Sequence, residues 1–191
     1  MNPAAAGPAA PARPNIPLGR VILFWIIAIA GATFDLTTKS YAFERLGEPG
    51  MKAPYSVVPN ILELLTSYNP GALWGFLRSV PHSSLIFAVL SIIAAIGICV
   101  WLFWLGAAVD RGLTISLALI MAGALGNCYD RLAIGKVRDF VHLHIDAINF
   151  DCAIFNFADN MLVVGALSLV LLALRPEASP EAEAVEPVAS A

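Results

Sequence analysis

The chain has few charged side chains: Asp, Glu, Lys and Arg together make up 13% of its 191 residues, about half the share in ordinary soluble domains. Hydrophobic residues make up 59%, and this balance favours an integral membrane protein. The formal net charge is −3, so the basic excess of a nucleic-acid-binding protein is missing. The three cysteines have unrelated spacings, which match neither a disulfide framework nor a zinc motif. A motif for a serine or cysteine nucleophile is missing as well.

The two ends of the chain lack the composition of a packed element. Residues 1–19 are rich in Ala and Pro, and residues 176–191 are acidic, so we expect both to be disordered tails. The apolar sequence begins only after Arg20 and has no clear small-x-small cleavage site, which argues against a secretory signal. We therefore expect one membrane domain over residues 20–175.

Four hydrophobic stretches lie between the tails, at residues 21–34, 79–109, 112–129 and 160–174. A membrane span needs about 20 residues at about 1.5 Å each. The first and last stretches are too short unless their helices include Asp35 and Lys39, and Asp159, respectively. These charges then lie within helices near one face of the membrane, together with the connections 40–78 and 130–155. We predict an all-α membrane protein with four transmembrane helices, in which residues 41–78 form a loop at that face.

Polar residues near the first helix form two clusters. Asp35 and Lys39, in DLTTK, are one helical turn apart, which also suits a simple ion pair on a helix. Asn69, Pro70 and Gly71, in SYNPGALWGF, favour a turn, and Gly71 with Ala72 allows close backbone approach. An interfacial loop flanked by aromatic residues explains this second cluster as well as a binding role does.

The segment 123–145 changes its periodicity after Gly135. Gly123 and its small neighbours suit close packing of membrane helices, and Asn127, Asp130 and Arg131 are predicted to end that helix with a polar turn. From residue 137 the period is two, which predicts a small β-element. One face of this strand carries Val137, Asp139, Val141, Leu143 and Ile145, so Asp139 is an acid on an apolar face. The other face carries Arg138, Phe140, His142, His144 and Asp146.

The last cluster, FNFADN, lies where the fourth helix begins. Asn156 suits an N-cap, with Asp159 at the third helical position, where the helix dipole favours an acid. Helical spacing also lets Asp159 face the interior of a bundle. Two acids that share a poorly solvated site hold one proton between them, and one acid beside one base suits peptide hydrolysis by an activated water. Asp139 and Asp159 are therefore the candidate catalytic pair.

These motifs resemble those of lipoprotein signal peptidase (signal peptidase II), a family of bacterial membrane aspartic proteases. The resemblance covers about residues 20–175. The matching motifs, in chain order, are DxxxK at 35–39, NxGA at 69–72, GALGNxxDR at 123–131, GxVxDF at 135–140 and FNxAD at 155–159. The last three, in this order, are the specific ones.

The resemblance implies that Asp139 and Asp159 are the catalytic dyad. The residues that it implies to shape the site or position the substrate are Asp35, Lys39, Asn69, Gly71, Ala72, Gly123, Asn127, Arg131, Val137, Asn156 and Ala158. The implied reaction removes the signal peptide of a diacylglyceryl-modified prolipoprotein, just N-terminal to the lipidated cysteine. The loop 41–78 would cover the substrate as a lid. The active site, the β-element and this lid would lie at the periplasmic face of the bacterial inner membrane, with both termini in the cytoplasm. A count of Lys and Arg predicts the opposite orientation.

Beyond the prolipoprotein substrate and membrane lipids, we expect no cofactor, no metal and no nucleic acid, and we expect a monomer. His142 and His144 are predicted to be surface residues on the face opposite Asp139, and His82 lies in a loop. Two other functions are considered. A transporter or proton-relay bundle requires polar residues through the membrane depth, whereas here they gather at one edge. A structural bundle, in which the acids only cap helices and form ion pairs, requires that substitution of either acid leave function unchanged.

Overall fold

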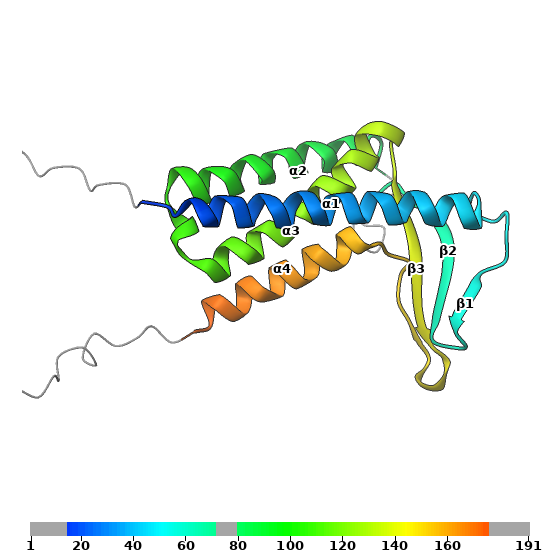
Figure 1. Ribbon diagram of the computed structural model, residues 1–191. Helices are drawn as coiled ribbons and strands as arrows, with labels where there is room; N and C mark the ends of the chain where they lie inside the picture. The colour runs from blue at the N-terminus through cyan, green and yellow to red at the C-terminus, as the bar shows by residue number, and fades with distance from the viewer. Residues whose placement is uncertain (1–14, 72–79, 176–191) are drawn as a thin grey trace, which may run out of the picture.

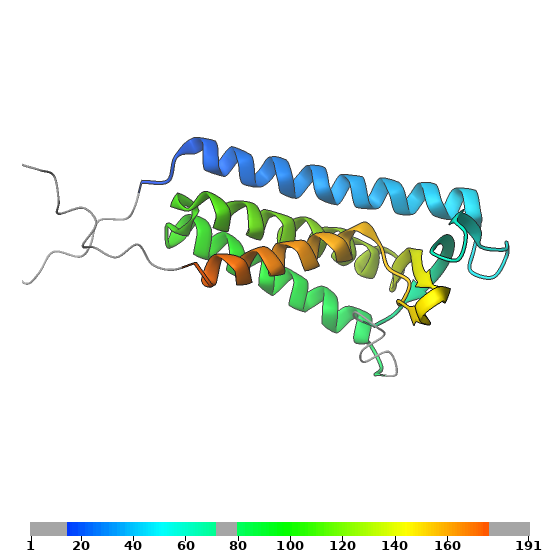
Figure 2. The same ribbon diagram turned by 90° about the horizontal axis from the view of Figure 1, so that it is seen from below.

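The computed structural model describes residues 15–71 and 80–175. Four α-helices run alongside one another, and a small antiparallel sheet lies at one end of this bundle (Figure 1). The helices are α1 (Leu18–Leu46), α2 (Ser83–Cys99), α3 (Arg111–Ile134) and α4 (Phe157–Ala173). The start of α1 and the end of α4 lie at the opposite end of the bundle from the sheet (Figures 1 and 2). The fold is therefore mostly helical, as predicted.

Three helices are long and apolar enough to cross a membrane: Leu18–Leu46, Ser83–Trp104, which includes a π-helical turn, and Arg111–Ile134. The helix α4 is apolar but shorter, with 17 residues. The predicted N-terminal tail 1–19 is wrong at its boundary, because α1 already begins at Leu18. The rest of that tail and the tail 176–191 lie outside the described residues.

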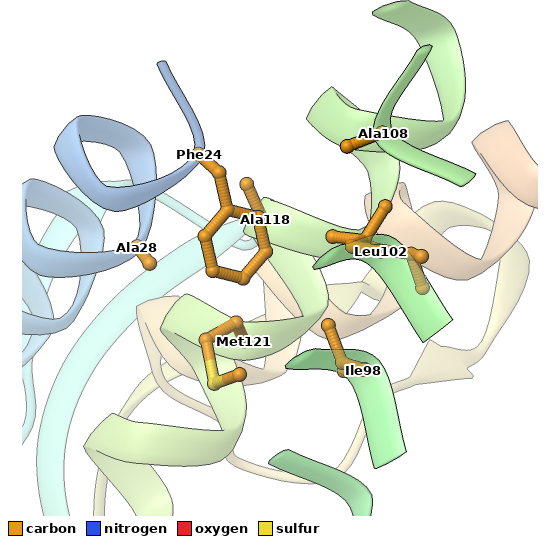
Figure 3. Packing of buried hydrophobic residues seen from close by; sticks show 8 residues of the cluster. Phe24, Ala28, Ile98, Leu102, Ala108, Ala118 and Met121 are labelled. Carbon is orange, nitrogen blue, oxygen red and sulfur yellow. The ribbon is translucent and has the colours of Figure 1, made fainter. Parts of the chain in front are cut away.

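The apolar core of the bundle joins α1, α2 and α3. Its buried residues are Phe24, Ala28, Ile98, Leu102, Ala108, Leu117, Ala118 and Met121 (Figure 3). The helix α3 is central, since it packs against each of the other three helices. Glycines bring α3 and α4 close together: a Cβ on Gly123 would lie 2.4 Å from the backbone oxygen of Ala158. This close approach places the first turn of α4 directly beside α3.

The helix α3 does not end where the sequence analysis predicts. It continues past the polar residues 127–131 to Ile134 and ends at Gly135, which has a φ of 73°. The positive φ suits glycine at a helix C-cap. Asn127 and Asp130 are buried, so they are polar residues that face the bundle interior and they do not signal a turn.

The sheet has the strand order β1-β2-β3-β4. Its strands are β1 (Tyr55–Val58), β2 (Leu62–Asn69), β3 (Val137–Ile145) and β4 (Phe150–Asp151). The described part of the predicted lid loop 41–78 is therefore not a loop: α1 extends to Leu46, and a β-hairpin follows. That hairpin pairs with β3, which places Asn69 opposite Val137 and Ser67 opposite Asp139.

The strand β3 has the predicted bounds, and Val137 and Asp139 are buried as predicted. Its other face is less exposed than predicted. Phe140 is only 5% exposed because its ring packs against the first turn of α4. The side chains of His142 and His144 are 21% and 16% exposed, so these histidines are largely covered and are not free surface residues.

Candidate active site

A buried lysine joins α1 to α3 at the sheet end of the bundle. Lys39 and Asp35 are fully buried, and Lys39 Nζ lies 2.7 Å from Asp35 Oδ2. The same nitrogen donates to Asn127 Oδ1 at 2.9 Å and lies 3.4 Å from Asp130 Oδ2. The predicted one-turn ion pair therefore exists, but it belongs to a network that crosses two helices. A buried charge needs such partners to remain ionised.

Two asparagines connect this network to the two candidate catalytic acids. Asn127 Nδ2 donates to Asp159 Oδ1 at 2.8 Å, and Asn156 Nδ2 donates to Asp139 Oδ1 at 2.6 Å. Asn156 Nδ2 also lies 3.2 Å from Asn127 Oδ1. Asp139 on β3 and Asp159 on α4 are thus joined through a chain of three side-chain hydrogen bonds.

The first turn of α4 combines a helix cap with an acid that faces the interior of the bundle. Asn156 caps the helix by accepting from the Asp159 N–H at 3.0 Å, and Asp159 Oδ2 accepts from the Asn156 N–H at 3.3 Å. The remaining oxygen of Asp159 faces Asn127 on α3. The N–H of Ala158 donates to Asp35 Oδ1 at 2.8 Å. The cap therefore fixes the position of Asp159, and it does not exclude Asp159 from a bundle-facing role.

Asp139 lies in a poorly solvated position at the start of β3 and is 2% exposed. Burial and, to a smaller extent, the nearby charge of Asp159 raise the pKa of its carboxyl from 3.8 to about 7. Hydrogen bonds from Asn156 and Asn69 act in the opposite direction but are smaller effects. A carboxyl group with this pKa carries a proton for much of the time at neutral pH.

The turn after β2 contacts α3 through a backbone oxygen. Arg131 Nη2 on α3 donates to the oxygen of Gly71 at 3.0 Å, and its guanidinium lies over the ring of Phe87 at 5.4 Å. Asn69 Oδ1 accepts from the Gly71 N–H at 3.0 Å, which is the side-chain turn typical of asparagine. Arg131 Nε is buried and has no hydrogen-bond partner among the described residues. Ala72, the remaining predicted residue of this turn, lies outside the described residues.

Val137 and Gly123 contribute by packing. Val137 is 2% exposed and pairs with Asn69 at the start of β3. Gly126 shares the role of Gly123, because a Cβ there would lie 2.4 Å from Asp35 Oδ2. The structure thus brings together all of the predicted site residues that it describes, which are Asp35, Lys39, Asn69, Gly71, Gly123, Asn127, Arg131, Val137, Asp139, Asn156, Ala158 and Asp159.

Two cavities of about 360 Å³ each meet at Asp159. The first lies between α2, α3 and α4 and is lined by apolar residues that include Phe87, Leu90 and Leu162, with Asn127 and Arg131 at its polar end. The second lies between the β3–α4 segment and α4. It is lined by Asn69, Leu143, Cys152, Ala153, Ile154, Phe155, Asn160 and Val163. Asp159 is therefore accessible from two mostly apolar cavities, whereas Asp139 lines neither of them.

Sequence reasoning missed one charged pair that supports this site. Asp130 is fully buried and accepts from the Arg138 side chain at 2.7 and 3.1 Å and from its backbone N–H at 3.0 Å. Arg138 Nη1 also donates to Ser40 on α1 at 3.1 Å. Asp130 lies one helical turn after Asn127, which was the available signal. The pair connects the start of β3 to α3, directly before Asp139.

Comparisons with known proteins agree with one another. Residues 27–175 match the family model described as signal peptidase (SPase) II. The lipoprotein signal peptidase of Pseudomonas aeruginosa is 36% identical over 86% of this chain and 94% of its own length. That of Pseudomonas fluorescens is 40% identical over 81% and 86%, and that of Rhodopirellula baltica is 34% identical over 88% and 78%.

Two solved structures share the fold. A bacterial membrane enzyme determined by the in meso method at 2.3 Å resolution has a TM-score of 0.70 and 30% identity, over 85% of this chain and 92% of that one. A second, at 1.9 Å resolution, has a TM-score of 0.69 and 29% identity, over 82% and 96%. With its apolar helices and the buried polar residues at one end of the bundle, the chain has the fold of these bacterial membrane enzymes. Within this class, the chain belongs to the signal peptidase II family.

Proposed function

We propose that the chain is an intramembrane aspartic endopeptidase that removes the signal peptide from diacylglyceryl-modified prolipoproteins, just N-terminal to the lipidated cysteine. Family membership supports the substrate, since the relatives carry the name lipoprotein signal peptidase. One observation carries the catalytic type: Asp139 and Asp159 are joined through Asn127 and Asn156, and the more buried acid has a pKa near 7. The pair therefore supplies one acid and one base at neutral pH.

The burial of the two acids suggests which one carries the proton. Asp139 is 2% exposed and borders neither cavity, so it is the proposed protonated acid. Asp159 borders both cavities and is the proposed base. Asp159 accepts a proton from a water whose oxygen bonds to the scissile carbonyl carbon, while Asp139 donates its proton to the carbonyl oxygen. The carbon–nitrogen bond then breaks, the nitrogen takes the proton held by Asp159, and Asp139 regains a proton as the new carboxyl group forms.

The two cavities suit the two apolar parts of such a substrate. The scissile bond of a prolipoprotein lies between a hydrophobic signal peptide and a cysteine that carries acyl chains. In the structure, two mostly apolar cavities meet at Asp159. We propose that the signal peptide occupies one and the diacylglyceryl group the other. Arg131 Nε, buried and without a partner among the described residues, is available to bind a backbone carbonyl of the peptide.

We further propose that all four helices cross the membrane as one domain over residues 20–175. The 17 residues of α4 span about 26 Å, which approaches the hydrocarbon thickness of about 30 Å. The sheet end then lies on the periplasmic side, where the precursor's lipidated cysteine is held at the membrane surface, and both termini lie in the cytoplasm. A reporter fused after Arg175 tests this orientation, and a periplasmic signal would contradict it.

The deciding experiment is cleavage of a diacylglyceryl-modified precursor by the purified protein. Asp139→Asn and Asp159→Asn keep the side-chain shape but remove the acid, and we expect each to lower turnover by about 100-fold or more. Asp110→Asn is the matched control, because Asp110 is an exposed N-cap of α3 and Asn caps equally well. Turnover near the wild-type value in either variant of the pair would exclude the proposed mechanism.

A further inference from the structure

A second cluster of polar side chains lies on the sheet, outside the active site. His142 and His144 are two residues apart on β3, so their side chains lie on the same face of the strand, and their ring centroids are 5.1 Å apart. Glu63 on β2 is the direct cross-strand partner of His142. One carboxylate oxygen of Glu63 and one ring nitrogen of each histidine lie within 4.8 Å of one another.

The hydrogen bonds of His142 leave one ring nitrogen directed to Glu63. His142 Nε2 lies 2.7 Å from Asp151 Oδ1 on β4, and His142 Nδ1 lies 3.8 Å from Glu63 Oε2. Metal-binding histidines commonly donate their second ring N–H to a carboxylate, which fixes the tautomer and the ring orientation. The Asp151–His142 contact has this geometry. In the tautomer with the proton on Nε2, Nδ1 is able to bind a cation.

Neither ring nitrogen of His144 has a hydrogen-bond partner among the described residues. Its Nδ1 is buried and has no hydrogen-bond partner among the described residues. Its Nε2 is 4.0 Å from Asp146 Oδ1, which is too long for a hydrogen bond. A buried imidazole nitrogen without a partner is unfavourable unless it binds water or a cation.

We propose that Glu63, His142 and His144 hold a divalent transition metal, of which Zn²⁺ is the best fit. Two imidazoles and one carboxylate with an open position for water form a common zinc ligand set. Imidazole ligands argue against Ca²⁺ and Mg²⁺, which prefer all-oxygen sites. A cavity of about 260 Å³, lined by these residues together with Asp146 and Asp151, gives the ion access to the cluster.

A metal here differs from the expectation that the chain holds none, in which His142 and His144 are separate surface residues. The pairing of β2 with β3 adds Glu63 to the two histidines. The bound ion would connect β2 to β3 at one end of their pairing, and the other end of the same pairing holds Asn69 and Asp139. The metal would therefore stabilise β3, the strand that carries Asp139, without contact with Asp139 or Asp159.

The test titrates Zn²⁺ into the full chain, purified in detergent without a polyhistidine tag, by isothermal calorimetry. We expect one ion per chain with low micromolar affinity or tighter, no binding of Mg²⁺, and a rise in the melting temperature with Zn²⁺. The double variant His142→Gln/His144→Gln should lose both the calorimetric signal and the Zn²⁺-dependent rise. Asp151→Asn, which keeps the ligands but changes the partner of His142, should weaken binding by about 10- to 100-fold.

A matched control separates this cluster from unspecific binding to histidine. His82, the one histidine of the chain outside the cluster, directly precedes α2. Its φ is 60°, a conformation that Asn tolerates. His82→Asn should bind Zn²⁺ as the wild type does. Wild-type protein that binds no Zn²⁺, or equal binding by the double variant and the wild type, would overturn the proposal. The melting temperature of each variant without metal shows that it is folded.

Discussion

Replacement of Asp139 by Asn should stabilise the protein at neutral and alkaline pH while it abolishes cleavage. The folded-state pKa of Asp139 is raised from 3.8 to about 7, so the folded protein binds a proton here that the unfolded chain releases above pH 4. Stability is therefore lost as the pH rises from about 4 to about 7 and is constant above that range. The rise of about three pKa units corresponds to roughly 4 kcal/mol at pH 8. Asp139 is 2% exposed, so solvent screening is small.

Asn at this position keeps the acceptor that Asn156 Nδ2 uses in the wild type. The penalty of ionisation then disappears, and the variant gains stability relative to the wild type as the pH rises. Between pH 5 and pH 8 the difference in unfolding free energy should grow by roughly 3 kcal/mol. For a chain of this size, that is a relative change in melting temperature of about 6–12 °C.

The assay is thermal unfolding in detergent, followed by tryptophan fluorescence at pH 5 and pH 8. Asp110→Asn serves again as the control, because Asp110 is exposed and its replacement should leave the difference between the two pH values unchanged. A gap between Asp139→Asn and the wild type that is the same at both pH values would refute the assignment of a raised pKa to Asp139. Loss of stability in the variant at pH 8 would refute it as well.

Two further variants test the packing and charge of the site by the same melting assay. Lys39→Met leaves Asp35 and Asp130 buried without their shared cation and should destabilise the protein by about 3–5 kcal/mol; wild-type melting would show that the lysine is dispensable. Gly123→Ala places a Cβ 2.4 Å from a backbone oxygen of α4 and should cost about 1–3 kcal/mol. Gly97→Ala, which lies inside α2 and meets no atom within 4 Å, is its control and should not destabilise the protein, because Ala favours the helix over Gly by up to about 1 kcal/mol.

The depth of the charged residues was predictable from the sequence because hydrophobic length is a strong signal. Too few apolar residues precede Asp35 and follow Asp159 to cross a membrane, so each acid had to lie within a helix near one face. The structure places both at the sheet end of the bundle. The strand Val137–Ile145 was also predictable, since its period of two begins directly after a glycine.

The β-hairpin of β1 and β2 was not predictable by the same means. In β2, Leu62, Leu64 and Leu65 do not alternate cleanly with polar residues, and the pairing has a bulge between Leu64 and Ser67. A bulge shifts the side-chain alternation by one residue, which hides the period of two. Without β2, the sequence gives no reason to place Glu63 opposite His142, and the histidines look like isolated surface groups. Which residues of β2 and β3 lie opposite each other depends on the register of the two strands. The hydrophobic pattern of β2 does not specify that register.

The charge balance of the site gives an independent argument for a shared proton. Among the described residues, four acids and three cations form the connected polar centre: Asp35, Asp130, Asp139 and Asp159, with Lys39, Arg131 and Arg138. With every group ionised, the centre would carry one uncompensated negative charge at the edge of a low-dielectric bundle, which is strongly unfavourable. One proton makes the centre neutral. Asp35 and Asp130 each lie within 3.4 Å of a cation. Within the part of the chain that the structure describes, no Lys or Arg forms an ion pair with Asp139 or Asp159, so the proton belongs on this pair. The arrangement that makes the bundle stable is therefore the same one that gives the pair one acid and one base.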